Sequence, residues 1–508
     1  MMIESPSVDT FRGISPAEFF YRNRQMAGFS NPTQALFTTV RELVENSLDS
    51  CEDAGVLPRI LITIDRKTPN VVLVSVSDNG TGVPTDVVPE AFGQVLYGSK
   101  YNSRQRRGTF GLGVTMSVLY GQITADSPVI IHTRTSDSEG MEYSILVDVE
   151  KNAPIIHWIK KKPRSEVGTT VTVELQGDLP RARERIIEYI RLSGISSPYA
   201  LFELDIIGHD QLRFGGFTKT LPQLPTVSKP HPHAADMELL RRLIAERSDA
   251  RLSEFLVDSF QQIGVQTARK FLKFINQDPQ VSVGTLSRAD VSRISHSLRK
   301  YSEFGRPRAD SLSPIGEEQF LRSIKAEFES TVMSYGTRGP LDWDGFPYII
   351  EGALALGDKF QSNDLPLLIR FANRVPLLYD TTDDVFAKVL KKIPWNKYGL
   401  KERNNVALFV HFCSTRVPYS AAGKQSIASV STIDSEILSL YRELGRRLNK
   451  ISEKHIAAGR YQRKYREFSR AFKLIVKFSG EVAGAAKLPD ADQMIRKLFE
   501  VDDDVKNQ

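Results

Sequence analysis

Three short polar motifs follow one another in the first part of the chain, and they constrain its fold more than any other feature. They are Glu42-x-x-x-Asn46, Asp78-x-Gly80-x-Gly82 and Gly108-x-x-Gly111-x-Gly113. The first lies in a segment with helical periodicity, the second directly follows a strand pattern, and the third opens another helical run. This alternation of helical and strand patterns predicts a layered α+β domain.

The first motif lies on the polar side of a helix predicted for residues 34–50. Phe37, Val40, Val44 and Leu48 form one face, and Glu42, Asn46 and Asp49 lie together on the opposite side. Any surface helix has such a polar stripe, so the pattern alone favours an ordinary solvated face. Glu45 and Asp49 are therefore interpreted as helix-surface carboxylates.

The two glycine motifs also have simple local explanations. Asn79-Gly80, after the alternating residues 72–76, is a strong hairpin-turn signal. The third motif opens the helical run 114–119, where glycines let backbone N–H groups approach an anion at the positive end of a helix. It is not a P-loop, because no Gly-Lys-Ser/Thr follows it. Each motif alone is weak evidence for a nucleotide site.

Together with Gly168-Thr169 on a later strand pattern, the motifs resemble the Bergerat ATP-binding fold of gyrase, heat-shock chaperones, histidine kinases and mismatch-repair ATPases. The resemblance implies that ATP and Mg²⁺ bind here. Glu42 would be the general base that deprotonates the water attacking the γ-phosphate. Asn46 would hold Mg²⁺ through its amide oxygen, and Asp78 would accept a hydrogen bond from the adenine amino group.

The resemblance also implies a wider set of nucleotide-site residues. With Asn46 and Asp78 they are Gly80, Gly82, Ser99, Lys100, Gly108, Thr109, Phe110, Gly111, Leu112, Gly113, Val114, Thr115, Thr169 and Gln425. Gly80 and Gly82 would leave room for the base, and residues 108–115 would form a lid around the phosphates. Thr115 departs from the family pattern, in which a lysine is expected.

Residues 15–32, 95–113 and 411–428 narrow the resemblance to the topoisomerase VI B subunits, the ATPase subunits of archaeal type IIB DNA topoisomerases. The similarity covers about residues 9–480. It implies a Bergerat-type ATPase α/β sandwich, a small helix–two-turns–helix domain and an α/β transducer domain with a long C-terminal stalk helix. The expected ranges are 1–14 for an N-terminal strap, 15–228 for the ATPase domain, 229–306 for the helical domain, 307–480 for the transducer and 481–508 for a tail.

The expected transducer contains two informative patterns. Ile433, Ile437, Leu440, Leu444, Leu448 and Ile451 form a coiled-coil-like stripe, which predicts a long helix. Gly423-Lys424-Gln425-Ser426 matches the family loop whose lysine reaches the γ-phosphate, so Lys424 is assigned to the catalytic site. A lone loop lysine would otherwise be expected in solvent. His411 and Cys413 are interpreted as alternate positions of one strand rather than as a catalytic pair.

Composition excludes several classes of protein. No apolar stretch among the 508 residues approaches the ~18–20 that span a bilayer, and the first residues lack the pattern of a signal peptide. Only two cysteines are present, so a disulfide scaffold is excluded. A cytoplasmic, nucleoid-associated protein without membrane contact is expected. Residues 441–477 hold 12 Lys or Arg against 3 Glu, which indicates either a solvated helix face or a surface for a polyanion.

The resemblance finally implies a function and its partners. ATP binding would close two B subunits into a gate, and double-stranded DNA would pass through a break made by the topoisomerase VI A subunit in an A2B2 assembly. DNA cleavage by a type II topoisomerase needs a tyrosine nucleophile beside carboxylate-bound Mg²⁺, and the resemblance assigns this step to the A subunit. The alternative is a chaperone-like or mismatch-repair-like ATP-gated clamp. A sensor kinase is disfavoured, because the phospho-acceptor helix and its histidine are missing.

Overall fold

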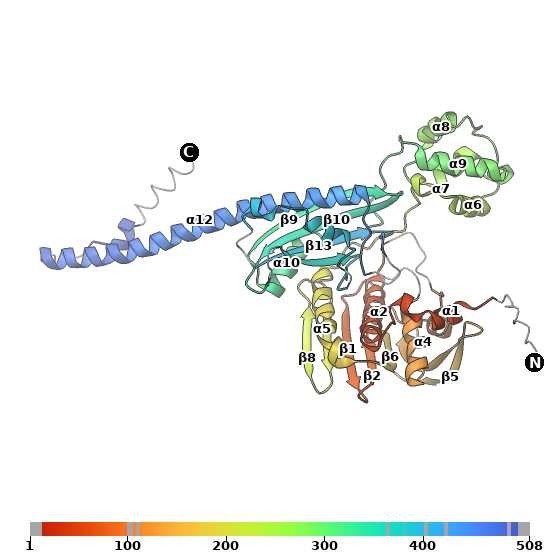
Figure 1. The fold of residues 1–508 in the computed structure, drawn as a ribbon, viewed down its shortest axis with the longest axis horizontal. Coiled ribbons are helices and arrows are strands. Elements are labelled where there is room, and N and C mark those ends of the chain that lie inside the picture. The colour runs from red at the N-terminus through yellow and green to blue at the C-terminus, as the bar shows by residue number, and fades with distance from the viewer. Residues whose placement is uncertain are drawn as a thin grey trace, which may run out of the picture.

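The computed structural model describes residues 13–98, 105–107, 112–361, 365–379, 381–400, 405–420, 425–484 and 489–495, except the side chains of 458 and 459. Within these ranges it contains two β-sheets covered by helices and a small all-helical region (Figure 1). The predicted α+β class is confirmed.

The first sheet has eight strands in the order β5-β4-β3-β6-β2-β1-β7-β8. The strands are β1 (Arg59–Arg66), β2 (Val71–Ser77), β3 (Val129–Arg134), β4 (Met141–Asp148), β5 (Ala153–Lys161), β6 (Gly168–Gln176), β7 (Leu201–Ile206) and β8 (Asp210–Gly215). All neighbours pair antiparallel except β1 and β7, which are parallel. The central position of β2 and β6 brings the ends of these two strands together.

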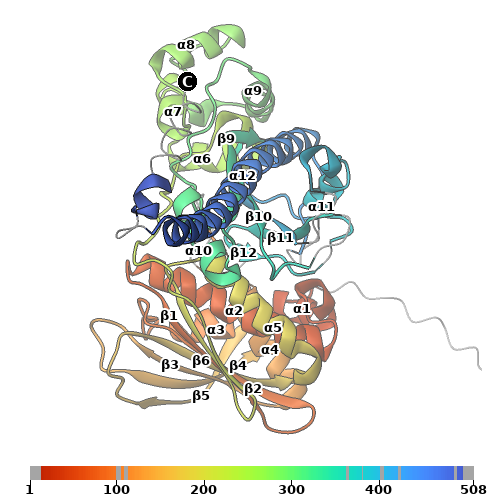
Figure 2. The same ribbon diagram turned by 90° about the vertical axis from the view of Figure 1, so that its left-hand side faces the viewer.

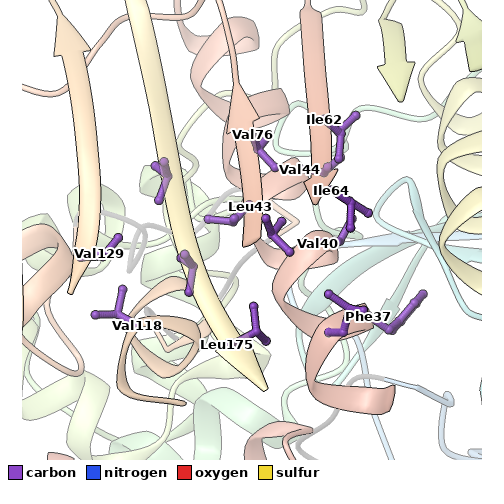
Figure 3. Packing of buried hydrophobic residues seen from close by; sticks show 14 of the residues in the cluster. Phe37, Val40, Leu43, Val44, Ile62, Ile64, Val76, Val118, Val129 and Leu175 are labelled. Carbon is purple, nitrogen blue, oxygen red and sulfur yellow. The ribbon is translucent and has the colours of Figure 1, made fainter. Parts of the chain in front are cut away.

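Helices cover one face of this sheet (Figure 2). They are α1 (Pro16–Arg22), the short 3₁₀ helix η1 (Arg24–Ala27), α2 (Pro32–Asp53), α3 (Val88–Gly93), α4 (Gly113–Ala125) and α5 (Leu179–Ser196). Val40 and Val44 of α2 are buried against the inward side chains of Ile62, Val76 and Leu175 (Figure 3). Burial of apolar surface at roughly 25 cal/mol per Å² stabilises this two-layer sandwich.

Four helices form a small region with its own hydrophobic core. In chain order they lie between the strands of the first sheet and those of the second. They are α6 (Met237–Glu246), α7 (Leu252–Ser259), α8 (Val265–Phe274) and α9 (Arg288–Lys300). Leu240, Phe255, Phe271 and Ile294 are among its buried residues. Figure 1 shows that this region lies beside the second sheet and away from the first.

The second sheet has five strands in the order β12-β11-β13-β10-β9. The strands are β9 (Val332–Trp343), β10 (Phe346–Leu356), β11 (Leu367–Ala372), β12 (Val375–Pro376) and β13 (Val406–Ser414). Every residue of β13 is buried, because helices cover both faces of the sheet. Helix α12 (Ser431–Ala483) and α11 (Val385–Leu390) pack on one face. Helix α10 (Glu317–Phe328) and the end of α5 pack on the other, so the two sheets share a hydrophobic contact through α5.

Helix α12 has 53 residues and is therefore roughly 80 Å long at 1.5 Å per residue. Its predicted apolar stripe is buried against the second sheet from Ile433 to Leu448. The buried part of the stripe ends at Leu448, one stripe residue earlier than predicted, because Ile451 is 41% exposed where the helix leaves the sheet. The rest of α12 projects beyond the sheet (Figure 1). Within the described ranges, neither α12 nor another helix combines the length and apolar character needed to cross a bilayer.

Candidate active site

Helix α2 carries the first two predicted site residues, Glu42 and Asn46. It begins after Asn31, whose side chain accepts a hydrogen bond from Gln34 N at 2.9 Å, and Pro32 occupies its first turn. Both residue types are favoured at these positions. The apolar face of α2 packs on the sheet and α4 and α5 pack beside the helix, which leaves its polar side for Glu42 and Asn46. Glu42 and Asn46 follow one another on that side by one helical turn.

The Glu42 carboxylate lies at the N-terminus of α4. Its Oε1 accepts a hydrogen bond from Arg41 Nη2 at 2.6 Å, and the residue is only 7% exposed. A Cβ at Gly113, the first residue of α4, would overlap with this carboxylate, so the close approach requires glycine. The N-terminus of a helix carries partial positive charge and attracts phosphate groups. Glu42 is therefore beside a position suited to a phosphate and can accept a proton from water there.

Asn46 is the candidate metal ligand. Its Nδ2 donates to the Glu42 carbonyl oxygen at 2.9 Å, which fixes the orientation of the amide. Mg²⁺ in phosphate-transfer sites is held by one or two protein oxygens together with phosphate and water. The amide oxygen of Asn46, one turn from Glu42, fits this role.

Asp78 directly follows β2 and accepts hydrogen bonds from three groups. Its Oδ1 accepts from Gly80 N at 2.9 Å and Thr169 N at 3.2 Å, and its Oδ2 accepts from Ser47 Oγ at 3.2 Å. Burial raises the pKa of the carboxyl, although these hydrogen bonds and the charge of Arg164 act in the opposite direction. A buried carboxyl held in one orientation can accept a hydrogen bond from the exocyclic amino group of adenine.

Two residues hold the backbone around Asp78. Gly82 has a φ of +71°, in the left-handed region, and a Cβ there would overlap with the Arg134 carbonyl oxygen. Arg164 Nη2 donates to the Asp78 carbonyl oxygen at 2.8 Å, and Arg164 Nη1 donates to Thr170 Oγ1 at 2.7 Å. The sequence does not indicate Arg164, because it lies outside every motif in the connection between β5 and β6.

The second sheet region also reaches this site. Tyr419 lies in the segment after β13. Burial raises the pKa of its phenol, the negative charges of Glu45 and Glu42 raise it further, and Arg41 lowers it. Phe37 of α2 packs against Tyr379, with ring centroids 5.1 Å apart, so the second sheet region contacts α2. Ser420 N donates to the Ser426 carbonyl oxygen at 3.0 Å, so the described residues on either side of positions 421–424 are joined.

Comparisons with known proteins identify the family. Residues 307–464 match the family "Topoisomerase VI B subunit, transducer", and residues 31–178 match "Histidine kinase-, DNA gyrase B-, and HSP90-like ATPase". The B subunit of type 2 DNA topoisomerase 6 from Saccharolobus islandicus (strain Y.N.15.51) is 40% identical over 454 residues, which are 88% of this chain and 86% of that relative. The Saccharolobus solfataricus protein of the same name is 39% identical over 447 residues, 87% of this chain and 84% of the relative. The chain belongs to the topoisomerase 6 B subunit family.

Membership of the topoisomerase 6 B subunit family makes this chain the ATPase subunit of a type II DNA topoisomerase, an isomerase, and favours that function over an ATP-gated clamp. The solved ATPase region of Saccharomyces cerevisiae topoisomerase II is also similar, with a TM-score of 0.43 and 12% identity over 88% of this chain and 100% of that chain. The family assignment rests on the sequence relatives and not on this distant likeness.

The structure describes many of the residues that the topoisomerase 6 B subunit resemblance assigns to the nucleotide. Those described are Glu42, Asn46, Asp78, Gly80, Gly82, Leu112, Gly113, Val114, Thr115, Thr169 and Gln425. Ser99, Lys100, Gly108, Thr109, Phe110, Gly111 and Lys424 lie outside the described residues, as do residues 1–12 of the expected strap. Asp78 and Thr169 are hydrogen-bonded, and Glu42 contacts Gly113. Thr115, at the expected lysine position, is a buried residue of α4.

Two expectations for α2 are wrong, because Glu45 and Asp49 are not surface carboxylates. Glu45 is 2% exposed and lies 3.4 Å from Arg41 Nε, and Asp49 is 7% exposed and lies 3.0 Å from Arg107 Nη1. These arginines supply the counter-charges that permit the burial of the two carboxylates.

His411 and Cys413 are both buried in β13, and each contacts a different side chain. His411 Nδ1 lies 2.7 Å from Glu351 Oε2, and Cys413 Sγ donates to Gln105 Oε1 at 2.7 Å. Because neither contact joins the histidine to the cysteine, the two residues do not form a catalytic pair.

Proposed function

We propose that this chain is the ATP-driven gate of a type IIB topoisomerase. ATP closes two copies of it around a DNA duplex, and the closure drives that duplex through a break made by the A subunit. The observation that carries the proposal is the attachment of residues 105–107, which directly precede the expected lid, to the second sheet region. Gln105 N donates to the Ser311 carbonyl oxygen at 3.0 Å, and Asn373 Nδ2 donates to the Arg106 carbonyl oxygen at 3.2 Å, so a bound nucleotide and the transducer would meet at one site. A ligand shifts a conformational equilibrium only if it binds the two states differently.

The proposed chemistry follows from the residues around Glu42. Glu42 takes the proton of the attacking water, and its carboxylate is held by Arg41 and by the start of α4. Asp78 binds the adenine amino group, with Thr169, Gly80 and Gly82 around it. Bound Mg²⁺, held through Asn46, would neutralise negative charge on the triphosphate. Ser99, Lys100, residues 108–115 and Gln425 complete the proposed nucleotide contacts, and Lys424 contacts the γ-phosphate.

The proposed division into domains assigns these parts. Residues 15–228 form the ATPase domain, 229–306 the helix–two-turns–helix domain and 307–480 the transducer. Residues 1–14 form the strap toward the partner copy, and 481–508 form the tail.

An apolar surface near the N-terminus supports the pairing of two copies. Phe19, Tyr21, Met26, Leu96 and Tyr97 are each between 38% and 48% exposed. Ser15 Oγ donates to the Val149 carbonyl oxygen, and Val95 N donates to Asn152 Oδ1 at 2.9 Å, so both segments flank the turn between β4 and β5. Exposed apolar residues gathered at one place are typical of an interface. We propose that a second copy of the chain covers this surface when ATP is bound.

A sedimentation experiment tests the ATP-dependent dimer. The wild-type chain is expected to be monomeric alone and dimeric with a non-hydrolysable ATP analogue. Tyr21→Asp with Met26→Asp is expected to remain monomeric, because charges would be buried in the interface. Ile207→Asp changes a residue that is 49% exposed at the turn between β7 and β8, and this control is expected to dimerise. A wild-type monomer under saturating analogue would contradict the gate.

The free end of α12 supports contact with the A subunit. Leu474, Ile475, Phe478 and Val482 are 50%, 59%, 60% and 90% exposed. These apolar residues lie on the part of the helix that projects beyond the sheet, at the end of the basic segment 441–477 and just after it. We propose that the A subunit binds this end in an A2B2 assembly and that the basic segment faces DNA. A nucleoid-associated, cytoplasmic location follows from a DNA substrate.

Relaxation of supercoiled DNA tests the proposed function. The chain together with the A subunit from the same source is expected to relax supercoiled plasmid when ATP is present. The chain without the A subunit, and the complex with ADP in place of ATP, are expected to leave the plasmid supercoiled. Failure of the A subunit to bind, together with an ATPase that DNA does not stimulate, would instead favour the ATP-gated clamp.

A further inference from the structure

A buried cluster of charged and polar side chains joins the ATPase sandwich to the second sheet region. Arg107 directly precedes the expected lid, residues 108–115, and its side chain is buried. Its Nη1 donates to Asp49 Oδ1 at 3.0 Å, and its Nη2 donates to Glu52 Oε1 at 2.7 Å. Nη2 also lies 3.3 Å from the Tyr199 hydroxyl. Both carboxylates belong to α2, the helix that carries Glu42.

Arg374 reaches the same cluster from the turn between β11 and β12. Its Nη1 donates to the Tyr199 hydroxyl at 2.9 Å and lies 3.8 Å from Glu52 Oε1. Its Nη2 donates to Ser313 Oγ at 2.7 Å. The Tyr199 hydroxyl donates to Glu52, so this one group bridges the carboxylate and both guanidinium groups. We call Arg107, Glu52, Tyr199 and Arg374 the interdomain cluster.

Hydrogen bonds of backbone and side-chain groups hold the lid stem, residues 105–107, against the second sheet region. Gln105 N donates to the Ser311 carbonyl oxygen at 3.0 Å, and Ser313 N donates to Gln105 Oε1 at 2.6 Å. Asn373 Nδ2 donates to the Arg106 carbonyl oxygen at 3.2 Å. Asn373 thus contacts Arg106 of the lid stem, and Arg374 contacts Tyr199, which is also a partner of Arg107. The lid stem, which directly precedes the expected lid, is therefore attached to the transducer side.

The backbone of Arg374 is itself held in place. Its φ is +67°, a region that side chains other than glycine adopt rarely and only when the surroundings enforce it. Its backbone N–H donates to His411 Nε2 at 3.0 Å, and His411 is in turn paired with Glu351. Among the described residues, the Nε atoms of Arg107 and Arg374 have no hydrogen-bond partner although they are buried. The cluster is therefore held in place on the transducer side, but not all of its buried hydrogen-bond donors have an acceptor in this conformation.

We propose that Arg374 is a positioning residue for ATP hydrolysis. It acts through Tyr199, Glu52 and Arg107 to set the lid stem and α2, and thereby the alignment of Glu42 with the γ-phosphate. Asp49 and Glu52 lie about two to three turns beyond Glu42 on the same helix, so a shift of the cluster is passed along α2 to the base. Movement of the transducer would alter catalysis by this route. The proposal rests on the proposed function, because it presumes that the transducer moves with nucleotide state.

The test compares steady-state ATP hydrolysis by full-length variants. Tyr199→Phe removes only the bridging hydroxyl, and Arg374→Gln removes the charge and the fork. Each is expected to lower kcat about tenfold, because misplacement of reacting groups by about 1 Å can cost up to about 100-fold. KM for ATP is expected to stay within about threefold, since Asp78 and its partners are untouched. Tyr143→Phe is the matched control, because its hydroxyl donates to the Thr85 carbonyl oxygen and lies outside the cluster.

Non-additivity separates positioning from a general loss of stability. If Arg374 acts through Tyr199, the second substitution should add no further loss. The kcat of the Tyr199→Phe, Arg374→Gln double variant should then lie within about twofold of the kcat of the less active single variant. Combination of Arg374→Gln with Tyr143→Phe should be additive. Losses that simply multiply in the first pair, or wild-type kcat in both single variants, would overturn the proposal.

Arg374→Lys keeps the experiment decisive if Arg374→Gln does not fold. Lysine retains the charge but cannot contact Tyr199 and Ser313 together, so kcat should again fall while KM is kept. Wild-type kcat for both Arg374→Lys and Tyr199→Phe would overturn the proposal. DNA relaxation by the wild-type complex is measured in parallel. If relaxation fails while hydrolysis shows the predicted coupling, only the proposed function is lost, and the opposite result removes only the role of Arg374.

Discussion

Glu42→Gln is expected to reduce ATP hydrolysis by about 10²–10⁴-fold, the usual cost of removing a general base. Nucleotide binding should remain close to that of the wild type, because Asp78 keeps its three donors. Glutamine has nearly the same shape as glutamate, so it fits against Gly113 without displacing α4. Phosphate release measures hydrolysis, and titration with a non-hydrolysable analogue measures binding.

Glu45→Gln provides a matched control for the Glu42 experiment. Glu45 is also buried on α2 and also pairs with Arg41, at 3.4 Å, but Gly113 at the start of α4 approaches Glu42 instead. Loss of a negative charge beside Arg41 is therefore common to both variants, and only Glu42→Gln removes the proposed base. Comparable losses in the two variants would attribute the effect to Arg41. Full turnover by Glu42→Gln would remove Glu42 from the mechanism.

Local patterns are sufficient to predict the motif-bearing elements of the first sandwich. The apolar arc of α2 and the alternation in β1 and β2 depend on neighbours in sequence, and the structure contains all three elements. The sequence does not predict β5, because its residues from Ile155 onward are exposed on both faces and give no alternation of polar and apolar side chains. β7 pairs in parallel with β1, about 140 positions earlier, and no local signal reports such a pairing.

The same limit explains the error at Asp49. Its position on the polar side of α2 is visible in the sequence, but its burial depends on Arg107, 58 positions away. Arg374, which approaches Glu52 of the same helix, lies in a turn more than 300 positions after Asp49 in the sequence. Family motifs indicate the residues that we propose bind the nucleotide, whereas Arg107 and Arg374 both contact Tyr199. Only the fold brings these three residues together, so sequence reasoning indicates the candidate nucleotide site but not its connection to the transducer.

Lys424→Ala is expected to abolish DNA strand passage and to lower the kcat of ATP hydrolysis by about 10²–10³-fold, the usual cost of losing a group that stabilises transition-state charge. Nucleotide binding through Asp78 should persist. The expectation rests on the residues around Lys424. Ser420 N donates to the Ser426 carbonyl oxygen, so the residues that flank this loop are joined. An ammonium group in this segment could contact the γ-phosphate and report its presence to α12, which begins at Ser431.

Two further variants, Lys424→Arg and Lys359→Ala, show whether the effect is specific to Lys424. Lys424→Arg keeps the charge but replaces a compact ammonium with a wider planar group, so partial activity is expected. Lys359→Ala removes an exposed lysine that pairs with Glu329, and this control should relax DNA like the wild type, because exposed ion pairs contribute little. The assay is plasmid relaxation in the presence of the A subunit, together with phosphate release. If Lys424→Ala relaxes DNA at the wild-type rate, the γ-phosphate is not sensed through this loop. Coupling between nucleotide and transducer would then have to run through the lid stem and Arg374 instead.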